Sequence, residues 1–154
     1  MRDVIRPVLF AAIAVLAFGV HASHAAQIVG LSGKCLDVSG GRTSNGAAVD
    51  LWPCGPGFPN QRWNFVGEAI VGIGGKCLDV RGGQAVDGAQ VEMWECNRGP
   101  NQRWHLSDGR IVGIGGKCLD VAGGNSDGGT GVLLWRCHGG ENQRWRILPS
   151  VIDR

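Results

Sequence analysis

The chain has 154 residues, including 27 Gly, six Trp, six Cys and no Tyr, and 18% of its residues carry a charge. This composition predicts one small, glycine-punctuated β domain, because long helices tolerate Gly poorly and disordered chains are less apolar than the 44% found here. The length argues against a two-domain enzyme. The net charge is only +2, and Lys and Arg are spread along the chain in ones and twos. The basic stripe that nucleic-acid binding requires is missing, so we expect no nucleic-acid partner.

The first 26 residues differ in composition from the rest. Arg2 and Arg6 precede an apolar run over residues 8–20, which is followed by small residues that end at Ala25 and Ala26. This order is typical of a secretory signal peptide over residues 1–26, with cleavage after Ala25 or Ala26. The alternative is a membrane anchor, but the run is shorter than the roughly 20 residues needed to span a bilayer. We therefore expect no membrane span and a secreted protein, extracellular, or periplasmic in a bacterium with two membranes.

The six cysteines all follow the leader, and the members of each successive pair are equally spaced. In an exported domain this repetition predicts three disulfides. The expected pairs are Cys35–Cys54, Cys77–Cys96 and Cys118–Cys137. Each bridge should stabilise the fold by about 3 kcal/mol. Neither a CxxC motif nor a Cys/His cluster is present, so we expect no metal site and no cofactor.

The sequence contains three copies of one unit of about 41 residues. QIVGLSGKCLDV at 27–38 returns as AIVGIGGKCLDV at 69–80 and RIVGIGGKCLDV at 110–121, and NQRW recurs at the same spacing. The domain over 27–154 therefore divides into repeats 27–68, 69–109 and 110–148, with a frayed tail. Each repeat contains four short apolar segments separated by turn residues, which predicts an all-β fold of twelve strands. Three units sharing one core favour a β-trefoil with pseudo-threefold symmetry, because the alternative, a propeller, needs at least four blades.

Strand alternation separates core-facing side chains from those that face away. It places Leu36 and Val38 inward, and pairs Trp63 with Phe65 on the inward face of the last strand of the first repeat. Trp104 and Trp145 occupy the same position as Trp63, so these three indoles are expected in the core. Because the termini begin and end equivalent units, they should also lie close together.

The same alternation turns a second set outward. Asp50 and Trp52 face away from the core together, and Asp37 does so on the preceding strand. An exposed indole beside a carboxylate suits a sugar, because one face of a pyranose is a patch of C–H groups and its rim carries hydroxyls. The candidate carbohydrate-binding residues are Asp37, Asp50, Trp52, Asn60 and Gln61, then Asp79, Glu92, Trp94, Asn101 and Gln102, then Asp120, Trp135, Asn142 and Gln143.

Other roles remain open for several of these residues. Asp37 could cap the turn at Gly40-Gly41. Gln61 lies two residues before a core Trp, so it could satisfy a buried backbone group. The outward Trp52 could instead cover the adjacent disulfide.

The repeated CLDV, LW-x-C and NQRW segments resemble the ricin B-type lectin family, whose Q-x-W signature is matched at residues 61–63, 102–104 and 143–145. The resemblance covers 27–148. It implies a β-trefoil that binds galactose-type sugars or xylan-like chains without catalysis, with an aspartate, an aromatic platform, an Asn and a Gln in each site. Members often carry Gln two residues before the platform, where this chain has Asp50, Glu92 and Leu133. Because Leu133 offers only its backbone, the third site is expected to be the weakest.

Three classes of function can be compared. A multivalent, non-catalytic lectin is the expected one. A glycosidase is disfavoured because the carboxylate pair Asp37 and Asp50 recurs as Asp79 and Glu92, which suggests repeated binding rather than one catalytic centre. The remaining alternatives are a binding or targeting subunit of a toxin or of a glycoside hydrolase, and a trefoil protease inhibitor.

Overall fold

The computed structural model describes residues 25–149, which form twelve strands and nine 3-10 helices. The strands are β1 (Ala26–Val29), β2 (Cys35–Val38), β3 (Ala47–Trp52), β4 (Asn64–Val66), β5 (Ala69–Val71), β6 (Cys77–Val80), β7 (Ala89–Trp94), β8 (His105–Ser107), β9 (Arg110–Val112), β10 (Cys118–Val121), β11 (Thr130–Trp135) and β12 (Arg146–Pro149). The 3-10 helices are η1 (Leu31–Gly33), η2 (Ser39–Gly41), η3 (Pro59–Gln61), η4 (Ile73–Gly75), η5 (Arg81–Gly83), η6 (Pro100–Gln102), η7 (Ile114–Gly116), η8 (Ala122–Gly124) and η9 (Glu141–Gln143).

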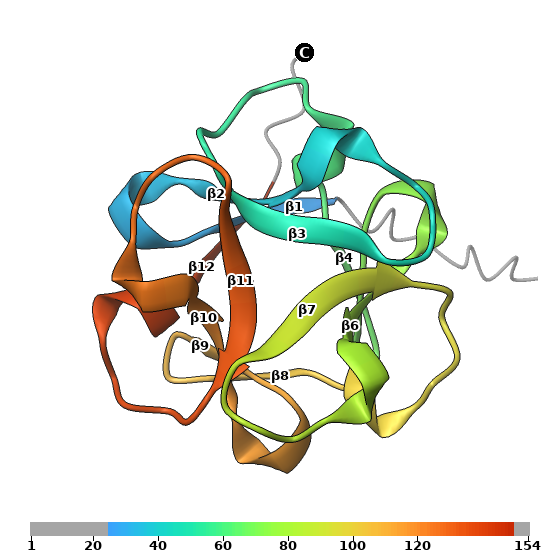
Figure 1. The fold of residues 1–154 in the computed structure, drawn as a ribbon. Coiled ribbons are helices and arrows are strands. Elements are labelled where there is room, and N and C mark those ends of the chain that lie inside the picture. Colours follow the sequence, from blue (N-terminus) through green and yellow to red (C-terminus); the bar gives the residue numbers. More distant parts are fainter. Residues whose placement is uncertain (1–24, 150–154) are drawn as a thin grey trace, which may run out of the picture.

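The strands fall four to each sequence repeat and form a β-trefoil, which confirms the predicted fold class. Figure 1 looks along the pseudo-threefold axis, around which β3, β7 and β11 are arranged and pair with one another in a cycle. Each of them also pairs with the second strand of its own repeat, β2, β6 or β10. Two hairpins, β4–β5 and β8–β9, join one repeat to the next, and the antiparallel pair of β12 and β1 joins the third repeat to the first.

The core lies inside this ring and has the same composition in each repeat. Leu36 and Val38 are fully buried, as alternation predicts, and so is Trp63. The Trp63 indole nitrogen donates a hydrogen bond of 3.0 Å to the Leu36 carbonyl, and Trp104 and Trp145 repeat this bond, so all three predicted core indoles are confirmed. The prediction for Phe65 is wrong: it is 37% exposed, because β4 pairs with β5 alone, in a hairpin at the end of the sheet.

Disulfides link residues within each repeat, and polar contacts link one repeat to another. The three predicted disulfides are all formed, one in each repeat. A loop of each repeat also receives a lysine from the following one. Lys76 Nζ lies 2.9 Å from Asn45 Oδ1, and Lys117 Nζ lies 2.6 Å from Asp87 Oδ1. Lys34 donates in the same way to the Ser126 carbonyl, which closes the cycle.

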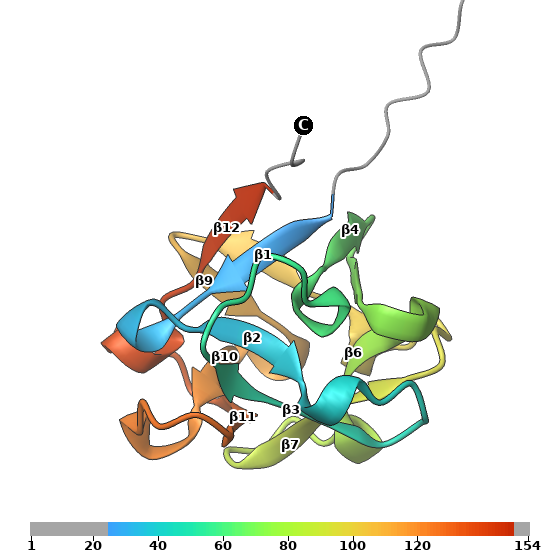
Figure 2. The same ribbon diagram turned by 90° about the horizontal axis from the view of Figure 1, so that it is seen from above.

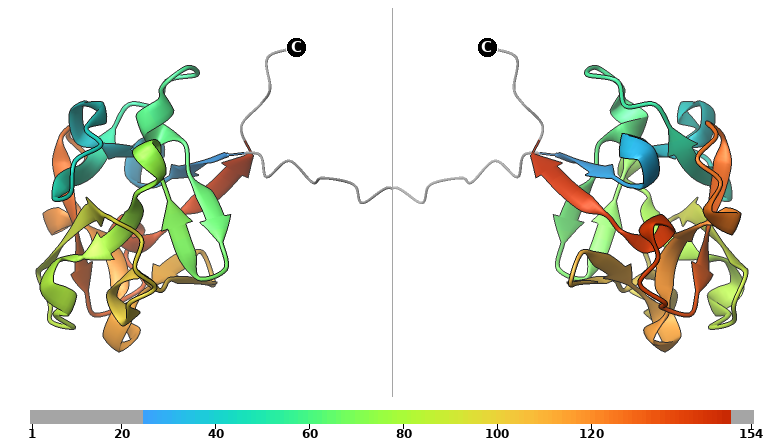
Figure 3. Two further views of the ribbon diagram at one scale, coloured as in Figure 1. Left: turned by 90° about the vertical axis from the view of Figure 1, so that its right-hand side faces the viewer. Right: turned by 90° about the vertical axis from the view of Figure 1, so that its left-hand side faces the viewer.

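The two ends of the domain lie side by side. β1 runs antiparallel to β12, as Figures 2 and 3 show, and the register of the pair places Ala26 opposite Pro149. Ala26 also exchanges two backbone hydrogen bonds of 2.8 Å with Trp63, so the first strand begins one residue before the predicted start of the domain. The rest of the predicted leader and residues 150–154 of the tail lie outside the described residues. Within residues 25–149, no helix is long and apolar enough to cross a membrane.

Candidate functional site

Each repeat carries one open hollow beside its outward tryptophan. We call these hollows sites 1, 2 and 3, with volumes of about 420, 540 and 350 Å³. Site 1 is lined by Asp37, Ser39, Gly40, Asp50, Trp52, Phe58 and Asn60. Site 2 is lined by Gly46, Asp79, Arg81, Gly82, Glu92, Trp94, Asn97 and Asn101. Site 3 is lined by Asp120, Gly123, Gly124, Leu133, Trp135, His138 and Asn142.

The platform indoles are open to solvent, as predicted. Trp52, Trp94 and Trp135 are 46, 40 and 37% exposed. Each platform also lies next to a glycine-containing loop of another repeat. A Cβ at Gly128 of the third repeat would lie 3.2 Å from the Trp52 ring, and one at Gly88 of the second would lie 3.7 Å from the Trp135 ring. Gly46 of the first repeat lines site 2, so site 2 is lined by residues of two repeats.

The carboxylates are brought together by strand register. Asp37 on β2 lies directly opposite Asp50 on β3, and Asp79 lies opposite Glu92 in the same way. These carboxylates face away from the core, as predicted. The prediction that they are exposed is wrong, because Asp37 and Asp50 are only 3 and 8% exposed. The physical reason is that η3 packs on β2 and η2 packs on β3, and these turns cover the carboxylates.

The Asp37 carboxylate is held by amides from η3. It accepts hydrogen bonds from Asn60 Nδ2 at 2.9 Å and from Gln61 Nε2 at 2.8 Å. Its partners are therefore on η3, and not in the Gly40-Gly41 turn that the sequence left open. Burial raises the pKa of Asp37, and the hydrogen bonds from Gln61 and Asn60 oppose that rise. The result is an acceptor of fixed orientation at the floor of site 1.

The second and third repeats keep this arrangement with one change. Asp79 accepts from Asn101 at 2.9 Å and from Gln102 at 2.7 Å, and burial raises its pKa too. Asp120 accepts from Gln143 at 2.8 Å, whereas Asn142 donates to the Val121 carbonyl and His138 Nε2 lies 3.4 Å from Asp120 Oδ2.

The glutamines lie beneath the hollows and line none of them. Gln61, Gln102 and Gln143 are 0, 2 and 0% exposed. Gln61 Oε1 accepts from the Gly55 backbone at 2.9 Å, and its Nε2 donates to Asp37 and to the Pro53 carbonyl at 3.0 Å. All its polar atoms are thus used inside the protein, which agrees with the alternative that Gln61 satisfies buried backbone groups.

Three residues that the sequence analysis missed make the sites different. Site 1 gains Phe58, which is 46% exposed and comes from a loop one residue longer than its counterpart in the second repeat; that extra residue was the signal in the sequence. In site 2 the Arg81 Nε pairs with Glu92 Oε2 at 2.6 Å. Site 3 has His138 and no acid at Leu133.

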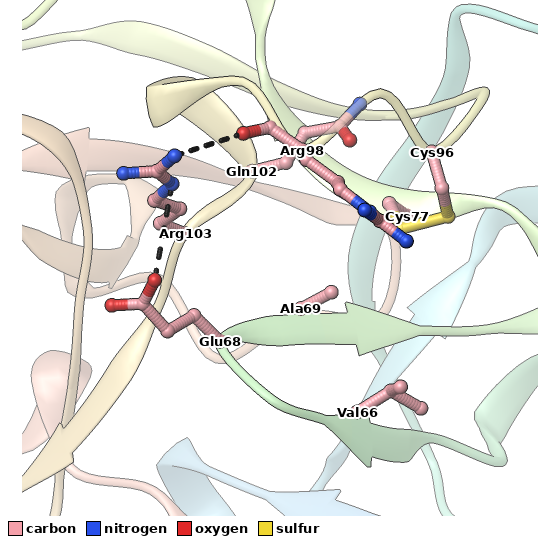
Figure 4. A pocket seen from close by; sticks show the side chains of 8 residues that line it. All are labelled: Val66, Glu68, Ala69, Cys77, Cys96, Arg98, Gln102 and Arg103. Atoms are coloured by element: carbon pink, nitrogen blue, oxygen red, sulfur yellow. Dashed lines mark hydrogen bonds and ion pairs between the residues drawn. A yellow bond between two sulfur atoms is a disulfide. The ribbon is translucent and has the colours of Figure 1, made fainter.

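A further hollow of about 290 Å³ lies outside the three sites, between the β4–β5 hairpin and the Cys77–Cys96 disulfide (Figure 4). Arg103 pairs with Glu68 at 3.8 Å and donates to the Arg98 carbonyl at 3.3 Å on its rim. This further hollow has no exposed indole, and Ala69 occupies the position that Gln27 and Arg110 have in the other two repeats. Among residues 25–149, no group of three His, Cys, Asp or Glu side chains could hold a metal ion.

A β-trefoil that repeats a hollow with an open indole over a buried, oriented carboxylate is the architecture of a carbohydrate-binding domain. The chain matches the Ricin-type beta-trefoil lectin domain over residues 24–145, and it belongs to this family.

Known proteins show the same likeness. The solved structure of the designed threefold-symmetric protein ThreeFoil has 35% identity and a TM-score of 0.75, over 80% of this chain and 97% of that one. A non-toxic homologue of type II RIPs from Momordica charantia, solved in complex with α-methyl-D-galactoside, has 27% identity and a TM-score of 0.72, over 81% of this chain and 47% of that one. Nigrin b from Sambucus nigra is 44% identical over 46 residues, which span 30% of this chain and only 8% of that protein.

Proposed function

We propose that the protein is a secreted, non-catalytic and multivalent lectin that binds galactose-type sugars or xylan-like chains through sites 1, 2 and 3. The observation that carries this proposal is the threefold recurrence of an exposed tryptophan beside a buried aspartate whose orientation is fixed by amides. The galactoside complex of the Momordica charantia homologue supports the galactose-type class.

Different residues of a site bind different parts of the sugar. The C–H face of a pyranose lies on the indole of Trp52, where it buries apolar area. Asp37 accepts from two adjacent hydroxyls of the ring, because an ionised carboxylate has acceptor capacity left after its two internal bonds. Asn60 borders the hollow and offers its Oδ1 to a third hydroxyl. Gln61 acts as a positioning residue, since it fixes the aspartate from below.

Affinity of one site is expected to be low. A shallow hollow with one platform and a few polar contacts suits a Kd of about 1 mM, or roughly −4 kcal/mol. Three sites on one rigid body raise the avidity for a polymer or a cell surface well above this value. Site 3 is the weakest of the three in this proposal, because Leu133 replaces the second acid.

The absence of catalysis and the export of the protein are part of the proposal. The opposed carboxylates recur in the second repeat as Asp79 and Glu92, where Arg81 neutralises Glu92, and this favours binding over a dedicated acid–base pair. The three disulfides support an oxidising compartment. Cleavage of the leader after Ala25 would preserve the backbone bonds of Ala26 to Trp63.

The test is a glycan array probed with the oxidised mature protein, followed by calorimetry with the best sugars. A variant with Trp52→Ala, Trp94→Ala and Trp135→Ala should lose binding and still fold and unfold cooperatively, because these indoles lie outside the core. Phe65→Ala is the matched control, since Phe65 is an exposed aromatic that lines none of the three sites. Unchanged glycan binding by the triple variant would refute the assignment.

A further inference from the structure

Site 1 differs from its two counterparts in electric charge. Its lining contains two carboxylates, Asp37 and Asp50, and no Lys, Arg or His, although Arg42 lies near Gly40 at its rim. Neither carboxylate takes part in an ion pair within residues 25–149. In site 2 the corresponding second acid is neutralised by Arg81, and in site 3 it is replaced by Leu133. Site 1 is therefore the most negative of the three hollows.

One buried oxygen of a residue that lines site 1 has no hydrogen-bond partner. Asp50 is only 8% exposed, and its Oδ1 is the one buried side-chain nitrogen or oxygen of residues 25–149 that makes no hydrogen bond. Leaving a buried carboxylate oxygen unbonded is costly, because it has lost water and gained no donor. Burial, and then the charge of Asp37, raise the pKa of Asp50 to about 6, while a hydrogen bond from Ser39 opposes the rise. The free protein thus holds an uncompensated charge that a positive ligand would relieve.

Two aromatic rings border the same charge. Trp52 and Phe58 both line site 1, and each is 46% exposed. The Phe58 ring lies over Gly55, where a Cβ would come within 2.3 Å of it, so the position of the ring depends on that glycine. Aromatic faces attract organic cations through their quadrupoles, and paired aromatic walls with nearby acids are a recurrent way to bind an ammonium group.

The geometry points to a ligand of defined chemistry: we propose that site 1 prefers an amino sugar with a free, protonated amine over the neutral and N-acetylated forms of the same sugar. This inference rests on the proposed lectin function and names the sugar class for one of its three sites. The ammonium group lies against Trp52 and Phe58, where the negative charges of Asp50 and Asp37 attract it. A bare metal ion is a poorer fit, because Ca²⁺ takes six to eight oxygen ligands and no cluster of three acidic, Cys or His side chains exists within residues 25–149.

Calorimetry on a protein with only site 1 intact tests the proposal. The background variant carries Trp94→Ala and Trp135→Ala, and the ligands are galactosamine, galactose and N-acetylgalactosamine, with the three glucose counterparts as a second set. Phosphate buffer is used, because amine buffers would compete. We expect the free amine to bind about tenfold more tightly than either neutral form, as a charge-assisted contact beside aromatic rings allows. About 0.5 M NaCl should reduce the preference by screening.

Matched variants of the same background locate the effect. Asp50→Asn should abolish the preference for the amine, whereas Asp108→Asn, an equally isosteric change at an exposed acid in the β8–β9 turn, should leave it intact. Phe58→Ala should weaken the preference, and Phe65→Ala should not. Melting temperatures confirm that each variant is folded.

Each outcome decides between the two proposals. Equal affinity for amino and neutral sugars, with neutral sugars still bound by the full protein, overturns the amine preference and leaves the lectin function standing. Binding of CaCl₂ alone that Asp50→Asn abolishes, without any amine preference, also overturns it, in favour of a cation site. Failure of every glycan on the array to bind the full protein removes both.

Discussion

Replacement of Asp50 by Asn should stabilise the protein in a pH-dependent way. Asn has the same shape but no charge, so the substitution removes the buried, unpartnered carboxylate without leaving a cavity. The folded protein raises the pKa of Asp50 from 3.8 to about 6, mainly through burial and then through Asp37. That rise of about two pKa units, at 1.36 kcal/mol each, corresponds to about 3 kcal/mol of destabilisation when Asp50 is ionised.

The sign of the effect follows from the direction of the pKa change. Below pH 3.8 Asp50 is protonated in both the folded and unfolded chains, so the substitution should change the free energy of unfolding little. Between pH 4 and 6 the unfolded chain ionises Asp50 first, and the native protein loses stability relative to the Asn variant. Above the folded pKa of about 6 the difference should be constant at about 3 kcal/mol.

Few other charges complicate this prediction. Asp37 faces Asp50 from β2, the residue opposite it on β11 is the uncharged Gly131, and Arg42 lies near Gly40 at the rim of the site. The same protonation should weaken binding of an amino sugar below pH 6, because site 1 then loses one of its two negative charges.

Urea unfolding followed by Trp fluorescence, at pH 4 to 8 with the disulfides intact, measures the difference directly. Urea is preferred because guanidinium is itself an organic cation that could enter site 1 and screens charges. Asp108→Asn is the control and should give a flat difference, since Asp108 is exposed. An Asp50→Asn variant no more stable than the native protein at pH 8, or equally stabilised at pH 4 and pH 8, would refute the reasoning.

Two further predictions concern the supports of sites 1 and 2. Gln102→Leu should lower the free energy of unfolding, measured in urea, by about 2 to 3 kcal/mol and abolish binding at site 2, because Asp79 loses a buried hydrogen-bond donor. Unchanged stability would show that Gln102 does not hold the carboxylate. Gly55→Ala should displace Phe58 and weaken amine binding at site 1, as measured by calorimetry. The control Gly57→Ala, whose added Cβ meets no atom within 4 Å, should bind like the native protein. Equal affinities of the two variants would show that Phe58 does not contribute to binding at site 1.

The sequence was sufficient for the architecture because every structural signal in it occurs three times. Repetition of Cys35 and Cys54 at one spacing defined the disulfides, and alternation around Leu36 placed the core side of β2. The rule failed for Phe65 because alternation predicts which face of a strand a side chain is on, but not whether another element covers that face. β4 lies in a hairpin at the end of the sheet, where neither face is fully packed.

The polar details of the sites depended on tertiary packing. Alternation placed Asp37 and Asp50 opposite the core correctly, but their burial comes from η2 and η3, short turns whose position over the strands no periodicity predicts. The orientation of Phe58 depends on the close approach of its ring to Gly55, which becomes visible only when the loop is folded. The contrast between sites thus arose from the irregular loops, where the repeats diverge.

The position of each platform next to a glycine loop of another repeat constrains how such a protein can be taken apart. A peptide of one repeat would carry its own aspartate and tryptophan but would lack the glycine loop that adjoins them, which comes from Gly128 for site 1, Gly46 for site 2 and Gly88 for site 3. Such a fragment would regain the loop beside its platform only by assembling with further copies of itself. The surroundings of each platform and the closure of the three-repeat ring are therefore coupled in this chain.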